Sequence, residues 1–204
     1  MKRRVTKLAV FLVCFVLLGA SVLVLFRETA LARAKSEKND AIEHIVTYLK
    51  GKKVEIGDDS LKAVVHSVYD ESQQVDLDYR LALAVIKVES NFRQDAVSKK
   101  GARGLFQIKP SLAKYIAKDA GVTWNGNECL HEPEKNVKLG VYHLSRLMDD
   151  FKSLPTALHA YNAGTNSMKA RSAKGVPKTA FTKQVMKEYQ KNLSILPDAE
   201  DTDK

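Results

Sequence analysis

An apolar run that ends in a carboxylate is the strongest constraint on how this chain can fold. Leu81 to Val88 contains a single charge, and Glu89 follows at once. A run of this polarity predicts a helix that is buried on nearly all sides, with Asp78 as its N-cap. Because burial disfavours the ionised form, Glu89 is expected to have a raised pKa and to serve as a general acid. A solvated glutamate at a helix end is the plain alternative.

The N-terminal segment has the pattern of a membrane anchor. Four basic residues within positions 1–7 precede nineteen residues without charge, Leu8 to Phe26. A helix of that length spans roughly the ~30 Å hydrocarbon core of a bilayer, whereas a cleaved signal peptide has an apolar core of about 7–15 residues. Small-residue sites at Ala32 and Ala34 leave cleavage open as the alternative. The basic end is expected to stay in the cytoplasm, which sends the rest of the chain outward.

The rest of the sequence predicts an all-α protein without a convincing strand or an internal repeat. Five segments are expected: a basic end at 1–7, an anchor at 8–26, a stalk at 27–57, a helical domain at 58–193 and an acidic tail at 194–204. Helices are predicted over 37–50, from a cap at Asp59 or Ser60, over 78–89, from Pro110 to about Asp119, from Pro133, from Pro155 to Gly164, and over 178–193.

Charge and cysteine content exclude several classes of function. The formal net charge is +9, but no basic run is interleaved with aromatic residues, so no nucleic acid is expected as a partner. Cys14 lies in the expected anchor and Cys129 beyond it, so no disulfide framework is expected. The histidines show no ligand-like spacing with each other or with Cys129, and we therefore expect no metal site and no cofactor.

Polar and glycine-rich motifs after the buried helix suggest a site for sugars. They are Glu89–Phe92, Gly101–Ile108 and Ala160–Gly164. Gln107 and Asn162 offer donors and acceptors for hydroxyl and acetamido groups, and Tyr161 adds an aromatic face with a hydroxyl. Each motif alone has a plain alternative, since a Gly-x-x-Gly loop is usually a turn and Tyr-Asn-Ala-Gly is usually a helix end.

In this order the motifs resemble the catalytic domain of the bacterial soluble lytic transglycosylases, which shares its fold with goose-type lysozyme. The resemblance covers roughly residues 76–172 and implies a lysozyme-like helical domain. Met is usual in the family at the position of Phe106, so one wall of the groove is expected to be bulkier here. The matching residues are Glu89-Ser90-x-Phe92, Ala96-x-Ser98-x-x-Gly101-Ala102-x-Gly104-Leu105-Phe106-Gln107-Ile108-x-Pro110, Pro133-x-x-Asn136-Val137-x-x-Gly140 and Ala160-Tyr161-Asn162-Ala163-Gly164.

The resemblance implies cleavage of the β-1,4 bond between N-acetylmuramic acid and N-acetylglucosamine in peptidoglycan, with formation of a 1,6-anhydro end. Glu89 would be the single catalytic residue, first as acid and then as base. His159 either lines the groove or is a surface or packing histidine. A hydrolytic lysozyme on the same fold and a non-catalytic peptidoglycan-binding component of an envelope-spanning machine are the alternatives. The residues expected to bind substrate are Ser90, Ser98, Gln107, Tyr161 and Asn162.

The N-terminal segment and the resemblance together imply a cellular setting. The expected location is the bacterial inner membrane, with the catalytic domain in the periplasm, or the free periplasm if the N-terminal segment is cleaved. Peptidoglycan glycan strands and the inner membrane are the expected partners, and a secretion or conjugation complex remains open. Because the sugar-binding motifs lie beyond residue 76, a fragment that begins at about Lys53 is expected to be soluble and to bind glycan.

Overall fold

The structure, a computed structural model, describes residues 2–164 and 179–198, with side chains from Ala20 onward. Two compact units emerge, Met1–Asp40 with Glu200–Lys204, and Ala41–Ala199. Over the residues described, no helix has a stretch long and apolar enough to cross a membrane. Residues 8–19 of the expected anchor have side chains outside this description, so the anchor stays a prediction.

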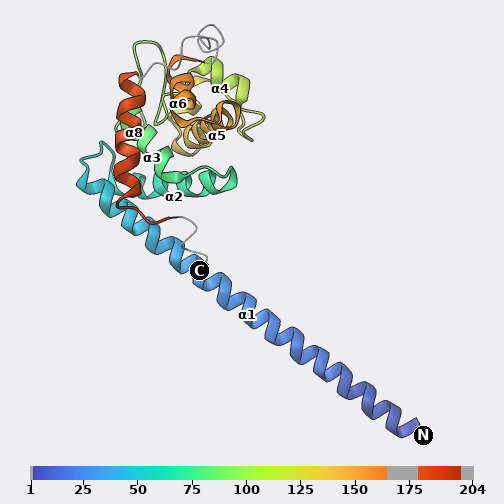
Figure 1. Ribbon diagram of the computed structural model, residues 1–204. Helices are drawn as coiled ribbons and strands as arrows, with labels where there is room; N and C mark the ends of the chain where they lie inside the picture. The colour runs from blue at the N-terminus through green and yellow to red at the C-terminus, as the bar shows by residue number, and fades with distance from the viewer. Residues whose placement is uncertain (1, 165–178, 199–204) are drawn as a thin grey trace. The chain divides into compact units, whose positions relative to one another are not determined.

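Helices form nearly all the regular structure between residues 41 and 198 (Figure 1). The only strand-like pairs among the described residues are the isolated bridges of Arg103 with Val97 and with Ile108. The predicted all-α fold is therefore confirmed for the described part of the chain. The elements are α1 (Lys2–Gly51), α2 (Asp58–Gln74), α3 (Tyr79–Glu89), α4 (Pro110–Ile116), the 3₁₀ helix η1 (Asn127–His131), α5 (Pro133–Phe151), α6 (Leu154–Ala163) and α8 (Ala180–Leu193).

Local signals set most helix starts. The carboxylate of Asp78 accepts a hydrogen bond from a backbone N–H in the first turn of α3 at 2.8 Å, which confirms the predicted cap. Pro110 and Pro133 are the first residues of α4 and α5, where a missing N–H does no harm. Helix α2 differs from the prediction, because it begins before Asp59 with Gly57 as an N-cap that makes no side-chain bond.

Helix α3 lies in the core of the larger unit, and α8 packs along it (Figure 1). Residues Leu81–Ile86 are each at most 3% exposed, as expected of a helix covered on nearly all sides. The end of α1 belongs to the same core, since Ile42, Ile45, Val46 and Leu49 are each at most 5% exposed. The compact unit therefore starts at Ala41, within the segment that the sequence analysis assigns to a stalk.

Two side chains that could take part in chemistry, a thiol and an imidazole, are buried in this unit. The thiol of Cys129 is free and its residue is only 2% exposed. His159 is 3% exposed, and neither ring nitrogen has a hydrogen-bond partner among the residues that the structure describes. This burial agrees with the packing alternative for His159 and not with a histidine that lines a groove.

Candidate active site

Glu89 is the last residue of α3 and is partly buried at the end of the apolar helix. Desolvation of its carboxyl group raises the pKa from 4.5 to about 7. This confirms the raised pKa that the preceding apolar run predicts. At neutral pH both protonation states are populated, so the same group can give a proton and take one back.

The residues that follow the acid form a strained turn. Asn91 and Phe92 both have left-handed backbone, with φ of 52° and 67°. Ser90 is buried, and its hydroxyl oxygen lies 2.8 Å from the carbonyl oxygen of Leu105 and 3.2 Å from that of Ile86. Its single proton is therefore used on the backbone, and the hydroxyl ties the turn after Glu89 to the loop that contains Leu105.

That loop is held by its own polar side chains. The side-chain amide of Gln107 donates to the carbonyl oxygens of Ala96 at 3.1 Å and Gly104 at 2.9 Å. The Ser98 hydroxyl accepts the backbone N–H of Ala102 at 3.0 Å. Both predicted substrate-binding residues thus stabilise the loop in the structure, and a direct contact of either with sugar stays a prediction.

Asn136 fastens the loop to α5, a role that the sequence analysis missed. Its side-chain amide donates to the carbonyl oxygens of Arg103 at 3.0 Å and Leu130 at 2.9 Å, while its oxygen accepts the N–H of Phe106 at 2.8 Å. A Cβ on Gly104 would lie 2.2 Å from the Asn136 amide nitrogen, so only glycine fits there. The sequence does contain a signal for this role, because Asn136 is a polar residue on the apolar face of the helix that begins at Pro133.

Phe106 is wholly buried, and its ring packs against α5 at Gly140. A Cβ on Gly140 would lie 2.1 Å from Cγ of that ring. The expectation that Phe106 makes one wall of a groove bulkier is therefore wrong, because the ring fills the core space that the missing side chain of Gly140 leaves.

Tyr161 brings α6 to the acid. Its hydroxyl donates to the carbonyl oxygen of Phe106 at 2.7 Å, next to the carbonyl of Leu105 that Ser90 contacts. Burial, and to a smaller extent the charge of Glu89, raise the pKa of Tyr161 well above its usual value. The tyrosine therefore stays neutral, with its proton directed at the backbone.

Two aromatic rings that the sequence analysis did not select flank Tyr161. The His143 ring centroid is 5.3 Å away at an interplanar angle of 37°, and that of Phe181 is 6.3 Å away and nearly parallel. Burial lowers the pKa of His143 to about 4, so this ring is neutral at pH 7. Asn162, the remaining predicted site residue, is exposed near the end of α6.

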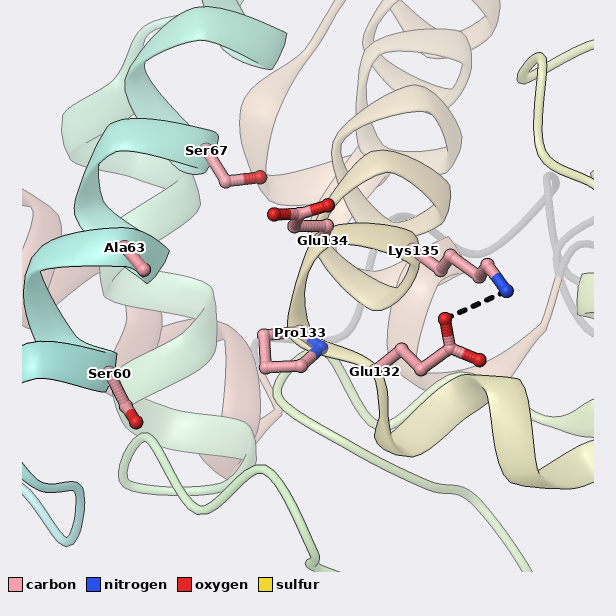
Figure 2. A pocket seen from close by; sticks show the side chains of 7 residues that line it. All are labelled: Ser60, Ala63, Ser67, Glu132, Pro133, Glu134 and Lys135. Atoms are coloured by element: carbon pink, nitrogen blue, oxygen red, sulfur yellow. Dashed lines mark ion pairs between the residues drawn. The ribbon is translucent and has the colours of Figure 1, made fainter.

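A pocket of about 210 Å³ lies elsewhere, between α2 and the start of α5 (Figure 2). Glu132 and Lys135 form an ion pair of 2.7 Å at its edge. None of the predicted site residues lines it, so the chemistry at Glu89, and not this hollow, defines the candidate site. The residues that line the pocket are Ser60, Ala63, Ser67, Glu132, Pro133, Glu134 and Lys135.

Within the described residues no group of three or more His, Cys, Asp or Glu side chains could hold a metal ion.

The transglycosylase SLT domain family matches residues 67–184, more than half of this chain, and the chain belongs to that family. This confirms the family that the motifs resemble. A transglycosylase of Enterobacteria phage PRD1 is 36% identical over 95 residues, which cover 47% of this chain and 32% of the relative. An endo-type membrane-bound lytic murein transglycosylase A of Klebsiella pneumoniae is 37% identical over 75 residues, 35% of this chain and 36% of the relative.

The fold is also that of a solved structure. The 70 kDa soluble lytic transglycosylase of Escherichia coli superposes with a TM-score of 0.58 at 19% identity, over 66% of this chain and 25% of that one. This chain thus spans about a third of the length of the two curated relatives and a quarter of the solved enzyme.

Proposed function

We propose that this protein is a peptidoglycan lytic transglycosylase in which Glu89 is the catalytic residue. One observation supports the assignment above others: burial raises the pKa of Glu89 to about 7 at the end of a core helix. Perturbed acids of this kind gather at catalytic sites. Membership of the SLT domain family supports the reaction class.

The reaction needs one group that is an acid first and a base later. Protonated Glu89 gives its proton to the glycosidic oxygen, the bond from that oxygen to the anomeric carbon breaks, and N-acetylglucosamine leaves with a free hydroxyl. The Glu89 carboxylate then takes the proton of the C6 hydroxyl of the muramoyl residue, whose oxygen bonds to the anomeric carbon. The product is a 1,6-anhydro ring, no water is consumed, and Glu89 is protonated again.

A pKa near 7 suits both halves of this cycle, because neither protonation state is costly to reach at neutral pH. Most glycosidases divide the work between two carboxyl groups. Among the described residues no second acidic side chain contributes to the pKa of Glu89. The intramolecular attack gains from proximity, which replaces a positioned water molecule.

The remaining predicted residues have two kinds of role in this proposal, positioning the loop and contacting the glycan, and some have both. Ser90 and Tyr161 position the loop beside the acid, because their hydroxyl protons are used on the carbonyls of Leu105 and Phe106. Tyr161 also presents a partly exposed ring, and Asn162 an exposed amide, to sugar. Ser98 and Gln107 shape the loop and offer their remaining polar atoms to the glycan.

Mass spectrometry of digested peptidoglycan tests this function directly. A lytic transglycosylase releases fragments with 1,6-anhydro ends, each lighter by one water than the reducing ends that a hydrolytic lysozyme produces. A wall-binding protein releases neither. Glu89→Gln keeps the shape of the side chain and should release no product, while Glu134→Gln, at an exposed position of α5, is the matched control and should release anhydro fragments. Reducing ends from the wild type would contradict the proposal.

We also propose that residues 8–26 hold the protein in the bacterial inner membrane, with the unit Ala41–Ala199 in the periplasm. The uncharged stretch behind four basic residues supports this arrangement. A tethered enzyme reaches only nearby glycan, which suits local opening of the wall, as for a secretion or conjugation complex, over bulk turnover. N-terminal sequencing of the membrane fraction tests the anchor, and a mature start just after Ala32 or Ala34 would contradict it.

A further inference from the structure

The connection between α1 and α2, residues 52–57, is hydrogen-bonded to the turn that follows Glu89, and we call these contacts the grip. The ammonium group of Lys87 donates to the backbone carbonyl of Lys52 at 3.0 Å. The backbone N–H of Glu55 donates to the carbonyl oxygen of Asn91 at 3.0 Å, and the side-chain amide of Asn91 donates to the Glu55 carboxylate at 2.8 Å. Asn91 is therefore bonded to Glu55 through both its backbone and its side chain.

This grip acts where the backbone is strained. Left-handed backbone is tolerated by asparagine but is unfavourable for a residue as bulky as Phe92. Such strain persists only when the surroundings over-determine it, and it gathers at functional sites. Phe92 is wholly buried. The second carboxylate oxygen of Glu55 lies 3.5 Å from the guanidinium of Arg93, so Glu55 contacts the residues directly before and after Phe92.

One side of these contacts lies outside the part of the chain that the family match covers, and the other side, Lys87 and Asn91, lies within it. Glu55 and Lys52 precede residue 67, where the SLT domain match begins. Helix α1 itself makes another link to α2, the ion pair of Glu43 with Lys62, and the side chains of Glu43 and Glu55 are exposed to a similar degree. The two pairs differ in their target, because only Glu55 contacts residues next to the acid.

We propose that Glu55 is a positioning residue that, through Asn91, fixes the left-handed turn at 91–92 and so orients the carboxyl group of Glu89 toward the glycan. The inference rests on the proposed function for its catalytic consequence. It makes the segment after α1 part of the active-site architecture, which the family match alone does not include.

Exchanging donor and acceptor tests the pair. The Lys87 ammonium donates to the side-chain oxygen of Asn91 and can stay bonded to an aspartate at that position. Asn91→Asp therefore keeps this contact and a residue that tolerates left-handed backbone, but it replaces the amide that donates to Glu55 by a second carboxylate oxygen. Adding Glu55→Gln restores one hydrogen bond with the donor on the other side. Since a displacement of about 1 Å can lower a rate by about 10²-fold, we expect Asn91→Asp and Glu55→Ala to lower kcat on peptidoglycan by about tenfold or more with KM little changed. The double variant Asn91→Asp with Glu55→Gln should recover most of this loss.

Glu43→Gln is the matched control, since it weakens the ion pair between α1 and α2 and should leave kcat unchanged. Melting temperatures of all variants separate loss of orientation from loss of fold. A double variant no more active than Asn91→Asp alone, or a kcat loss in Glu43→Gln equal to that in Glu55→Ala, would overturn the proposal.

Titration of the Glu89 carboxyl group by ¹³C NMR tests the positioning role of Glu55 without an activity assay. In Asn91→Asp the loosened turn should admit water and lower the pKa of Glu89 toward its ordinary value, against the direction in which an added carboxylate acts. The double variant should restore it. An unchanged Glu89 titration in Asn91→Asp would overturn the positioning role. If the wild type releases no glycan product, the proposed function fails, and this titration still tests the grip on its own.

Discussion

Replacing Glu89 by glutamine should stabilise the protein at alkaline pH while it removes activity. Burial raises the pKa of Glu89 from 4.5 to about 7, so ionisation is harder in the folded than in the unfolded state. Between these values the folded protein binds more protons than the unfolded chain, and stability falls as the pH rises. Above pH 7 the loss is complete, and at about 1.4 kcal/mol for each pKa unit it reaches about 3 kcal/mol.

The free energy of unfolding of wild type and Glu89→Gln should be measured at pH 4 and pH 8 by denaturant titration. Glutamine does not titrate, so the change in the difference between the two proteins isolates this carboxyl group. We expect the difference to shift by about 3 kcal/mol in favour of the variant at pH 8, which corresponds to about 6–12 °C in Tm for a domain of this size. Near pH 4 the contribution should vanish, because the group is protonated in both states.

Glu134→Gln provides the control, because Glu134 is exposed in the first turn of α5. A carboxylate there is favoured by the helix dipole by about 0.3–1 kcal/mol, so its removal should act in the opposite direction at pH 8. If the stability difference between wild type and Glu89→Gln were the same at both pH values, the carboxyl group of Glu89 would not be desolvated, and the argument for a single acid and base would be refuted.

Three further outcomes are expected. The rate of peptidoglycan cleavage should fall about tenfold per pH unit above about 7 as Glu89 loses its proton, and a pH–rate profile without this alkaline limb would contradict the assignment. Gly140→Ala should destabilise the protein by about 1–3 kcal/mol in thermal unfolding, since its Cβ would lie 2.1 Å from a buried ring, whereas Gly51→Ala meets nothing within 4 Å and should be neutral. A fragment that begins at Ala41 should fold cooperatively by circular dichroism. The structure reverses the expectation from the sequence for a fragment that begins at Lys53, which should not fold, because it lacks the buried face of α1.

The sequence predicted what depends on neighbours along the chain. Asp78 and the two prolines at 110 and 133 mark helix starts through their own backbone chemistry, and each was predicted correctly. The raised pKa of Glu89 was predictable for the same reason, because the apolar residues that desolvate it directly precede it.

Features that depend on distant contacts were out of reach. The face of α1 formed by Ile42, Ile45 and Leu49 has a spacing that fits a solvated stalk as well as a core helix, and only the docking of α1 against the rest of the unit distinguishes them. The burial of Phe106 follows from Gly140 on another helix. The stacking of Tyr161 with Phe181 joins residues on α6 and α8, and no local pattern indicates it.

The buried thiol of Cys129 can serve as a chemical probe of unfolding. An unpaired cysteine in an oxidising compartment is prone to covalent dimerisation, yet a residue that is 2% exposed reacts only after the protein opens. In a Cys14→Ser background, the disulfide-linked dimers that accumulate on a non-reducing gel would therefore count the molecules that have unfolded. Under oxidising conditions, the rate of that accumulation would report the lifetime of the folded state without any assay of activity.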